Sequence, residues 1–277
     1  MRAIETLRGH TVDVTSVTEF PYFDHPLPLP MAHRGGALYG PNVGLENSLT
    51  AFANAVSMGY RYLETDAHAT RDGVVYAFHD RTLDRVTDGT GRIADLSSSE
   101  VSQAKIAGRE PIPTLADLFE ELPDARFNID VKEDSAVDAV VDLIRRTRTH
   151  DRVCIAAFST RRIRRLRRGL GPRVATSMGT SEVAAMRSPL AAFRWQAAQG
   201  GAVCVQVPPR AWRIRLTTRK FVTEAHRHGL QVHVWTVNEA DQMTALLDIG
   251  VDGIITDRID TLRDLLIARG SWDAAPE

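Results

Sequence analysis

Short apolar segments alternate along the chain with longer segments in which apolar residues recur every three or four positions. Short apolar runs are typical of buried strands, and the longer spacing is typical of helices that bury one face. We expect strands over residues 29–33, 62–66, 126–131, 153–158, 174–177, 202–207, 231–235 and 253–256. We expect helices over residues 48–58, 114–121, 135–149, 160–169, 182–199, 217–228, 239–249 and 259–269.

This alternation of strand and helix predicts an α/β fold of the (β/α)8 TIM barrel type, because each strand–helix unit adds one parallel strand. We expect a single domain over residues 1–277, with its barrel core at about 29–269. A doubly wound open sheet is the alternative. It is less consistent with the sequence, because no glycine-rich dinucleotide-binding turn follows the first predicted strand.

One region interrupts the alternation after the second predicted strand. Asp72 and Gly73 lie between strand-like segments and predict a hairpin turn. The polar stretch that follows, about residues 81–112, predicts a small insertion between the second strand and the second helix.

The composition is that of an ordinary globular protein, with 43% hydrophobic and 25% charged residues and a net charge of −1. This balance gives no global attraction to nucleic acid, and no apolar run is long enough for stable membrane insertion. The N-terminal segment lacks the apolar stretch of a secretory signal. Cys154 and Cys204 lie in apolar runs and predict buried thiols without a disulfide. Together these features predict a cytoplasmic location.

Polar side chains stand at the ends of several predicted strands, where a TIM barrel forms its active site. His33 and Arg34 end the first strand, and Glu64 and Asp66 end the second. Further polar or aromatic residues end or follow the other strands: Asp130, Lys132, Ser159, Trp235 and Asp257. We therefore expect a charged site at the carboxyl-terminal end of the barrel.

Three of these acids are candidate metal ligands. Residues i and i+2 of a strand point to the same face, so Glu64 and Asp66 share a face, and so do Asp130 and Lys132. Three carboxylates meeting at one point suit one divalent cation, Mg²⁺ or Ca²⁺, better than zinc. The alternative is that each acid pairs with an arginine at the surface.

Two histidines are candidate proton-transfer groups. His33 and His79 each follow an apolar run and precede a charged residue. Histidine titrates near neutral pH and so serves as general acid or general base. A structural role is the alternative for either histidine taken singly.

These residues lie in motifs that resemble one known family. HRGG begins at His33, LENSLTAF at Leu45, ETD at Glu64, DGVVYAFHD at Asp72 and FNIDVK at Phe127. VHVWTVN spans 232–238 and GVDGIITD spans 250–257. In this order and spacing, the motifs resemble the glycerophosphodiester phosphodiesterase family over nearly the whole chain, about residues 31–269.

The resemblance implies roles for individual residues. His33 and His79 match the catalytic histidines of the family, and Arg34 and Lys132 match its phosphate-binding cations. Trp235 matches an aromatic residue that lines the substrate pocket.

The resemblance also implies that Glu64, Asp66 and Asp130 are the metal ligands. The family often has Glu where this chain has Asp130. We expect Glu46, in the loop after the first strand, to support substrate binding, whereas Asn47 either caps the first helix or contacts phosphate.

The implied function is metal-dependent hydrolysis of glycerophosphodiesters to sn-glycerol 3-phosphate and an alcohol. One alternative keeps the chemistry and changes the substrate to a lysophospholipid, as in a lysophospholipase D or a sphingomyelinase D-like enzyme. Another is a barrel that binds phosphodiesters without catalysis. The sequence leaves the oligomeric state open.

Two features stay outside this interpretation. The run TRRIRRLRRGLG, residues 160–171, predicts a helix with arginines on its solvent face, and attraction to an anionic membrane is the alternative. Trp195 and Trp212 fall in segments that the pattern does not place. We expect each of these tryptophans either to pack in the core or to form part of a lipid-facing wall.

Overall fold

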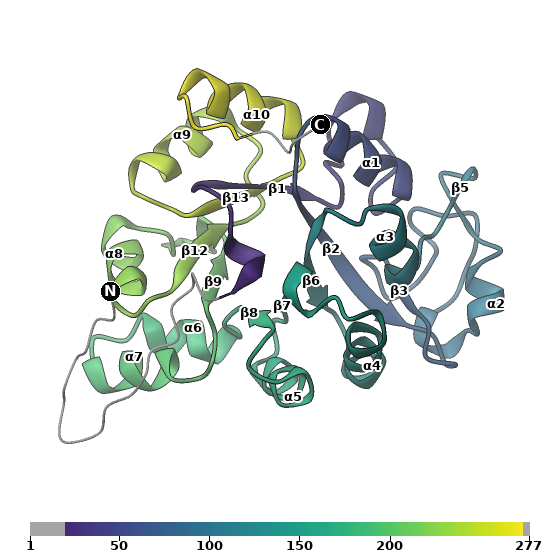
Figure 1. Cartoon of the computed structure of the whole chain (residues 1–277), viewed down its shortest axis with the longest axis horizontal. Helices are drawn as coiled ribbons and strands as arrows, with labels where there is room; N and C mark the ends of the chain where they lie inside the picture. The colour runs from purple at the N-terminus through teal and green to yellow at the C-terminus, as the bar shows by residue number, and fades with distance from the viewer. Residues whose placement is uncertain (1–19, 274–277) are drawn as a thin grey trace.

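The computed structural model describes residues 20–273 and shows a ring of parallel strands surrounded by helices (Figure 1). The strands of the ring are β1 (Leu29–His33), β2 (Tyr62–Ala69), β6 (Arg126–Val131), β7 (Val153–Ala156), β8 (Ala175–Thr176), β9 (Cys204–Val207), β12 (Gln231–Val234) and β13 (Gly253–Thr256). The outer helices are α1 (Leu49–Ser57), α3 (Leu115–Glu121), α4 (Val137–Thr147), α5 (Thr160–Leu170), α6 (Thr180–Met186), α7 (Ala191–Ala198), α8 (Arg219–Arg227), α9 (Ala240–Asp248) and α10 (Ile259–Ala268).

The strand order is β8-β7-β6-β2-β1-β13-β12-β9, and all neighbouring strands in this order pair in parallel. A parallel bridge between Ser177 and Cys204 connects the two ends of the sheet. The sheet is therefore a nearly closed (β/α)8 barrel, as predicted, and the open doubly wound alternative is wrong.

Local signals position the helices at the carboxyl ends of the strands. The Ser48 hydroxyl accepts a hydrogen bond from the backbone N–H of Ala51, so Ser48 is the N-cap of α1. Thr114 and Asp117 form a capping box at the start of α3. Because each cap sets where its helix begins, it also sets the length of the loop that leaves the barrel mouth.

The prediction of one helix over 182–199 is wrong. The structure has α6 and α7 there, separated by a break that contains Pro189. Proline lacks a backbone N–H and restricts the residue before it, so a helix does not continue through this point.

The second strand is longer than predicted because it also pairs with β3 (Val75–Ala77), antiparallel across the Asp72–Gly73 turn. The stretch after it contains η4 (Ile93–Asp95), α2 (Ser98–Val101), β4 (Lys105–Ile106) and β5 (Glu110–Pro111). Residues of this stretch, among them Leu83, Ile93 and Ile106, form a small apolar cluster with Tyr76 and Phe78. The insertion thus packs on the barrel beside β2, as the right of Figure 1 shows.

The barrel is closed by apolar packing at its amino-terminal end. Tyr22 and Phe23, in the short helix η2 (Pro21–Phe23), belong to the same buried cluster as Met31 and Tyr62 of the barrel strands. The Tyr62 hydroxyl donates to the backbone carbonyl of Tyr22 at 2.7 Å. Because this end is filled, the carboxyl-terminal end is the one left for a site.

Cys154 and Cys204 lie in the same cluster and are both buried and free, with 3.8 Å between their sulfur atoms. Within residues 20–273, no helix is long and apolar enough to cross a membrane. The expectation that no secretory signal begins the chain concerns residues outside the described range.

The turn after β1 depends on Gly35, and we expect Gly35→Ala to lower the free energy of unfolding by about 3 kcal/mol. Gly35 has φ +84°, and a Cβ there would lie 2.8 Å from the backbone carbonyl carbon of Ala51. Gly44→Ala is the matched control, because Gly44 has φ +79° and no atom within 4 Å of an added Cβ. Urea unfolding measures both, and an equal loss would show that the contact with α1 contributes nothing.

Candidate active site

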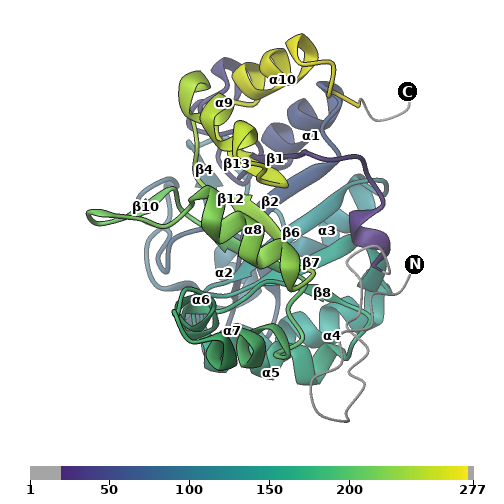
Figure 2. The same cartoon turned by 90° about the vertical axis from the view of Figure 1, so that its left-hand side faces the viewer.

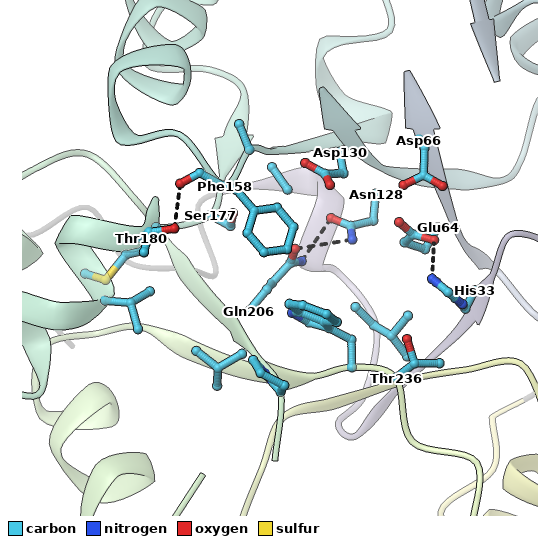
Figure 3. A pocket seen from close by; sticks show the side chains of 18 of the residues that line it. His33, Glu64, Asp66, Asn128, Asp130, Phe158, Ser177, Thr180, Gln206 and Thr236 are labelled. Carbon is cyan, nitrogen blue, oxygen red and sulfur yellow. Dashed lines mark hydrogen bonds and ion pairs between the residues drawn. The ribbon is translucent and has the colours of Figure 1, made fainter. Parts of the chain in front are cut away.

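A cavity of about 400 Å³ opens at the carboxyl-terminal ends of the strands. Charged and titratable side chains line it: His33, Arg34, Glu64, Asp66, His79, Asp130 and Lys132. Figure 3 shows His33, Glu64, Asp66 and Asp130 on one side of the cavity. Strand alternation explains the arrangement on β2. Leu63 and Ala67 pack against the outer helices, while Glu64 and Asp66 face the cavity.

His33 ends β1 and is held by acids on both sides. Its Nδ1 donates to Oδ1 of Asp257 at 2.6 Å, and its Nε2 lies 3.7 Å from Oε2 of Glu64. Asn238 donates in turn to the other oxygen of Asp257 at 2.9 Å. Burial by itself lowers the pKa of His33, but the negative charges of Glu64 and Asp257 outweigh it and leave that pKa above its ordinary value.

His79 stands after β3 and reaches the same cavity. Its Nδ1 lies 2.6 Å from Oδ1 of Asp80, and Asp80 also pairs with Arg85 from the insertion. The buried His68 of β2 contacts the backbone carbonyl of His79 through Nε2 at 3.1 Å. Contacts from β2 and from the insertion therefore both orient His79.

Arg34 spans the gap between β1 and β2. Its Nε lies 3.2 Å from Oδ2 of Asp66, and its NH1 donates to Glu46 at 3.0 Å. Arg85 also contacts Glu46, at 2.7 and 2.9 Å. Glu46 therefore lies behind Arg34 and is absent from the residues that line the cavity. Asn47 lies 3.5 Å from Asp66 and accepts a hydrogen bond from Thr65.

Lys132 joins the two aspartates of the cavity. Its Nζ lies 2.7 Å from Oδ1 of Asp66 on β2 and 2.7 Å from Oδ2 of Asp130 on β6. Lys132 lowers the pKa of Asp66 below its usual value against the opposing effect of burial, and the two aspartates raise the pKa of Lys132. Both carboxylates are therefore paired with the same ammonium group.

The predicted metal ligands Glu64, Asp66 and Asp130 all line the cavity. Across the described residues, no three His, Cys, Asp or Glu side chains form a ready-made ligand cluster. The donor chemistry nevertheless fits a hard cation. Oδ1 of Asp130 is buried without a hydrogen-bond partner, and burial together with the charge of Asp66 raises the pKa of Glu64 to about 7. The ion pair with Lys132 thus leaves one oxygen of Asp130 open to a divalent ion, whose positive charge would also favour the ionised form of Glu64.

The opposite side of the cavity is apolar. It is lined by Phe158, Met178, Val207, Pro208, Leu216 and Trp235. Phe158 packs edge to face on Trp235 at 5.5 Å between ring centroids and is 57% exposed. Nζ of Lys132 lies 5.9 Å from the Phe158 ring centroid, so the charged and apolar sides meet there.

Sequence reasoning missed the residues that orient the histidines. Asp257 was noted only as a polar residue after the last strand, although strand-end placement was the signal for its role. Asp80 directly follows His79, so that contact is local in the sequence. No sequence signal links Arg85 to this pair, because the contact of Arg85 with Asp80 depends on how the insertion folds back. His68, which the buried strand β2 carries, also contributes to holding His79.

A (β/α)8 barrel with paired histidines, cations and acids at its mouth is an architecture suited to an anionic substrate. The chain belongs to the glycerophosphoryl diester phosphodiesterase family, whose model matches residues 33–261. It is accordingly a phosphoric diester hydrolase, and members of this family are generally dependent on a divalent metal.

Two curated relatives align with this chain over nearly their full length. The chain is 45% identical to "Probable glycerophosphodiester phosphodiesterase 2" of Mycobacterium tuberculosis over 249 residues, covering 88% of this chain and 93% of that protein. It is 27% identical to the human protein "Lysophospholipase D GDPD1" over 309 residues, covering 95% and 96%.

Solved structures share the fold. A glycerophosphoryl diester phosphodiesterase described as putative, from Silicibacter pomeroyi, superposes with a TM-score of 0.78 at 23% identity, over 92% of this chain and all of that one. A phosphodiesterase from Oleispira antarctica, solved in complex with the product sn-glycerol-3-phosphate, has a TM-score of 0.73 at 21% identity, over 87% and 97% of the chains. At these identities the likeness is one of fold.

The raised pKa of Glu64 predicts a loss of stability with rising pH in the metal-free protein. The pKa of Glu64 is about 7 in the folded state, against an ordinary value of 4.5, so the folded state binds more protons between these two pH values. Ionisation of Glu64 therefore costs about 3 kcal/mol of unfolding free energy by the time pH exceeds 7. We expect Glu64→Gln to remove this fall, as measured by urea unfolding against pH with chelator present.

The exposed Glu120 of α3 provides the control for this measurement. Glu120→Gln should leave the pH dependence of stability as it is in the wild-type protein. If the unfolding free energies of the wild-type protein and Glu64→Gln changed with pH in parallel, the surroundings of Glu64 would not destabilise its ionised form.

Proposed function

We propose that the protein hydrolyses glycerophosphodiesters to sn-glycerol 3-phosphate and an alcohol. The observation that carries the proposal is the meeting of His33 and His79 with Arg34 and Lys132 around one cavity of a family barrel. The name of the Mycobacterium tuberculosis relative and the product bound to the Oleispira antarctica enzyme both support this substrate class.

Arg34 and Lys132 are suited to bind the phosphoryl oxygens. Both cations line the cavity and both already contact carboxylates, so their positions are set before a substrate enters. Fixed positive groups stabilise the charge that develops on phosphorus-bound oxygens and cost no reorganisation during the reaction. Trp235 and the apolar side of the cavity would hold the alcohol portion.

The two histidines would divide the proton transfers. The raised pKa of His33 favours its protonated form near neutral pH, which suits a general acid for the departing alkoxide. The contact of Nδ1 of His79 with Asp80 leaves Nε2 to take a proton from the nucleophile. Asp257 and Asp80 act as positioning residues, because each holds one imidazole without lining the cavity.

Glu64, Asp66 and Asp130 would hold one divalent cation, Mg²⁺ or Ca²⁺. When bound, the ion supplies Lewis-acid stabilisation of the phosphoryl oxygens. The unpartnered oxygen of Asp130 and the raised pKa of Glu64 support this assignment. Glu46 would act on the substrate through Arg34, whose orientation it sets.

A lysophospholipid is the second candidate substrate. The apolar wall of the cavity, with its exposed Phe158, and the name of the human relative both favour it. Release of choline from glycerophosphocholine and from lysophosphatidylcholine, measured side by side, distinguishes the two. We further propose that residues 1–277 form a single catalytic domain, and the cytoplasmic location stays a prediction.

Removing either imidazole tests the catalytic assignment. We expect His33→Ala and His79→Ala each to lower kcat on glycerophosphocholine by about 10²–10⁴-fold, the usual contribution of general acid–base catalysis. His150→Ala is the control, because His150 precedes β7 at the opposite end of the barrel. Near-normal kcat in a site variant would remove that histidine from the mechanism, and no activity in the wild-type protein would favour a barrel that only binds.

Chelation tests the metal assignment. We expect EDTA to abolish hydrolysis and added Mg²⁺ or Ca²⁺ to restore it, with Asp130→Asn needing about tenfold or more ion. The ion should also raise the melting temperature of the wild-type protein, because it binds only the folded state. Asp134→Asn is the control, since Asp134 pairs with Arg162 outside the cavity. Full activity in EDTA would contradict the proposal.

A further inference from the structure

A short hairpin projects from the barrel at the left of Figure 2, and its Ala211 lines the cavity. It consists of β10 (Arg210–Ala211) and β11 (Ile214–Arg215), which pair antiparallel. Trp212 lies in the two-residue turn and is 100% exposed, and Ile214 is 61% exposed. A fully exposed tryptophan contributes little to folding stability. An exposed aromatic and aliphatic pair at the tip of a hairpin is instead typical of a site that binds a partner outside the chain.

The hairpin also carries positive charge that no acidic side chain of the described residues pairs with. Arg210, Arg213 and Arg215 are all exposed, and none forms an ion pair within residues 20–273. The sequence contains no Asp or Glu between Glu182 and Glu224. The positive charge of the tip is therefore not neutralised by its own segment.

The arginine-rich helix α5 differs in this respect. Four of its arginines pair with acids of neighbouring elements, and these pairs are Arg162–Asp134, Arg164–Glu182, Arg165–Asp138 and Arg167–Glu182. The helix therefore uses most of its charge within the protein. The hairpin, and not α5, is the basic surface free to meet an anionic partner.

The hairpin is continuous with the apolar wall of the cavity. Ala211 and Leu216 line that wall, and Phe158 lies exposed on the same rim. Arg187 donates to the backbone carbonyls of Leu216 and Arg215 and so ties the base of the hairpin to the body. Anything bound at the tip is thus held at the entrance of the cavity.

We propose that this hairpin docks the protein on the surface of an anionic phospholipid bilayer. Tryptophan prefers the membrane–water interface, and arginines beside it pair with lipid phosphates. The hairpin is too small for a stable protein interface, which covers about 800 Å² on each partner. A bilayer needs no such area, because a few aromatic and basic side chains suffice for reversible binding.

Vesicle cosedimentation of the intact protein at low salt tests this docking and does not depend on catalysis. We expect binding to phosphatidylcholine vesicles that contain phosphatidylglycerol and none to pure phosphatidylcholine. Trp212→Ala should weaken binding about tenfold. The double variant R213Q/R215Q should weaken it about 25-fold, at about fivefold for each charge. All of these side chains are exposed, so thermal unfolding should match the wild-type protein.

The double variant R161Q/R168Q is the matched control, because it removes the same charge from exposed positions of α5. It should bind vesicles like the wild-type protein. The proposal is overturned if anionic vesicles do not bind, if the control loses binding equally, or if the hairpin variants bind normally. It is also overturned if the hairpin binds a single-stranded oligonucleotide but no vesicles, or if Trp212→Ala only converts a dimer to a monomer. A failure of the proposed hydrolysis would leave this test unaffected.

Discussion

The site depends on the double ion pair that Lys132 makes with Asp66 and Asp130. Buried carboxylates on adjacent strands repel each other and lose hydration, so they need a positive partner held at short range. Lys132 lies two residues after Asp130, directly beyond the end of β6, and both reach the cavity because side chains alternate along the extended backbone. The same alternation places Leu63 and Ala67 against the outer helices. The two-residue repeat of the strand therefore separates the side chains of the charged site from those of the core.

The cavity divides into a charged half and an apolar half, which matches the two ends of a phosphodiester. Arg34 and Lys132 lie with the acids and histidines on one side, and Phe158 and Trp235 pack together on the other. The exposed hairpin with Trp212 continues the apolar side beyond the rim. The surface proposed to bind the substrate and the surface proposed to bind lipid thus lie next to each other.

Much of this was predictable from the sequence, because the relevant signals are local. The strand-end positions of His33, Glu64 and Asp130 predicted that they share one mouth, and the alternation predicted which side chains face it. The break between α6 and α7 was missed although Pro189 marks it. Glu46 is predicted to support substrate binding, and the structure adds that it lies behind Arg34, in contact with Arg85 of the insertion, which no local signal reveals.

The sequence by itself determined the barrel, its strands and the residue types at its mouth, since periodicity, caps and motifs are properties of neighbouring residues. Only the tertiary structure decided which acid holds which histidine and which arginines are neutralised. Asp257 meets His33 across 224 positions, and the tip of the hairpin stays free of ion pairs among the described residues while most arginines of α5 do not. Such pairings arise from closure of the sheet, which brings distant segments within hydrogen-bonding distance.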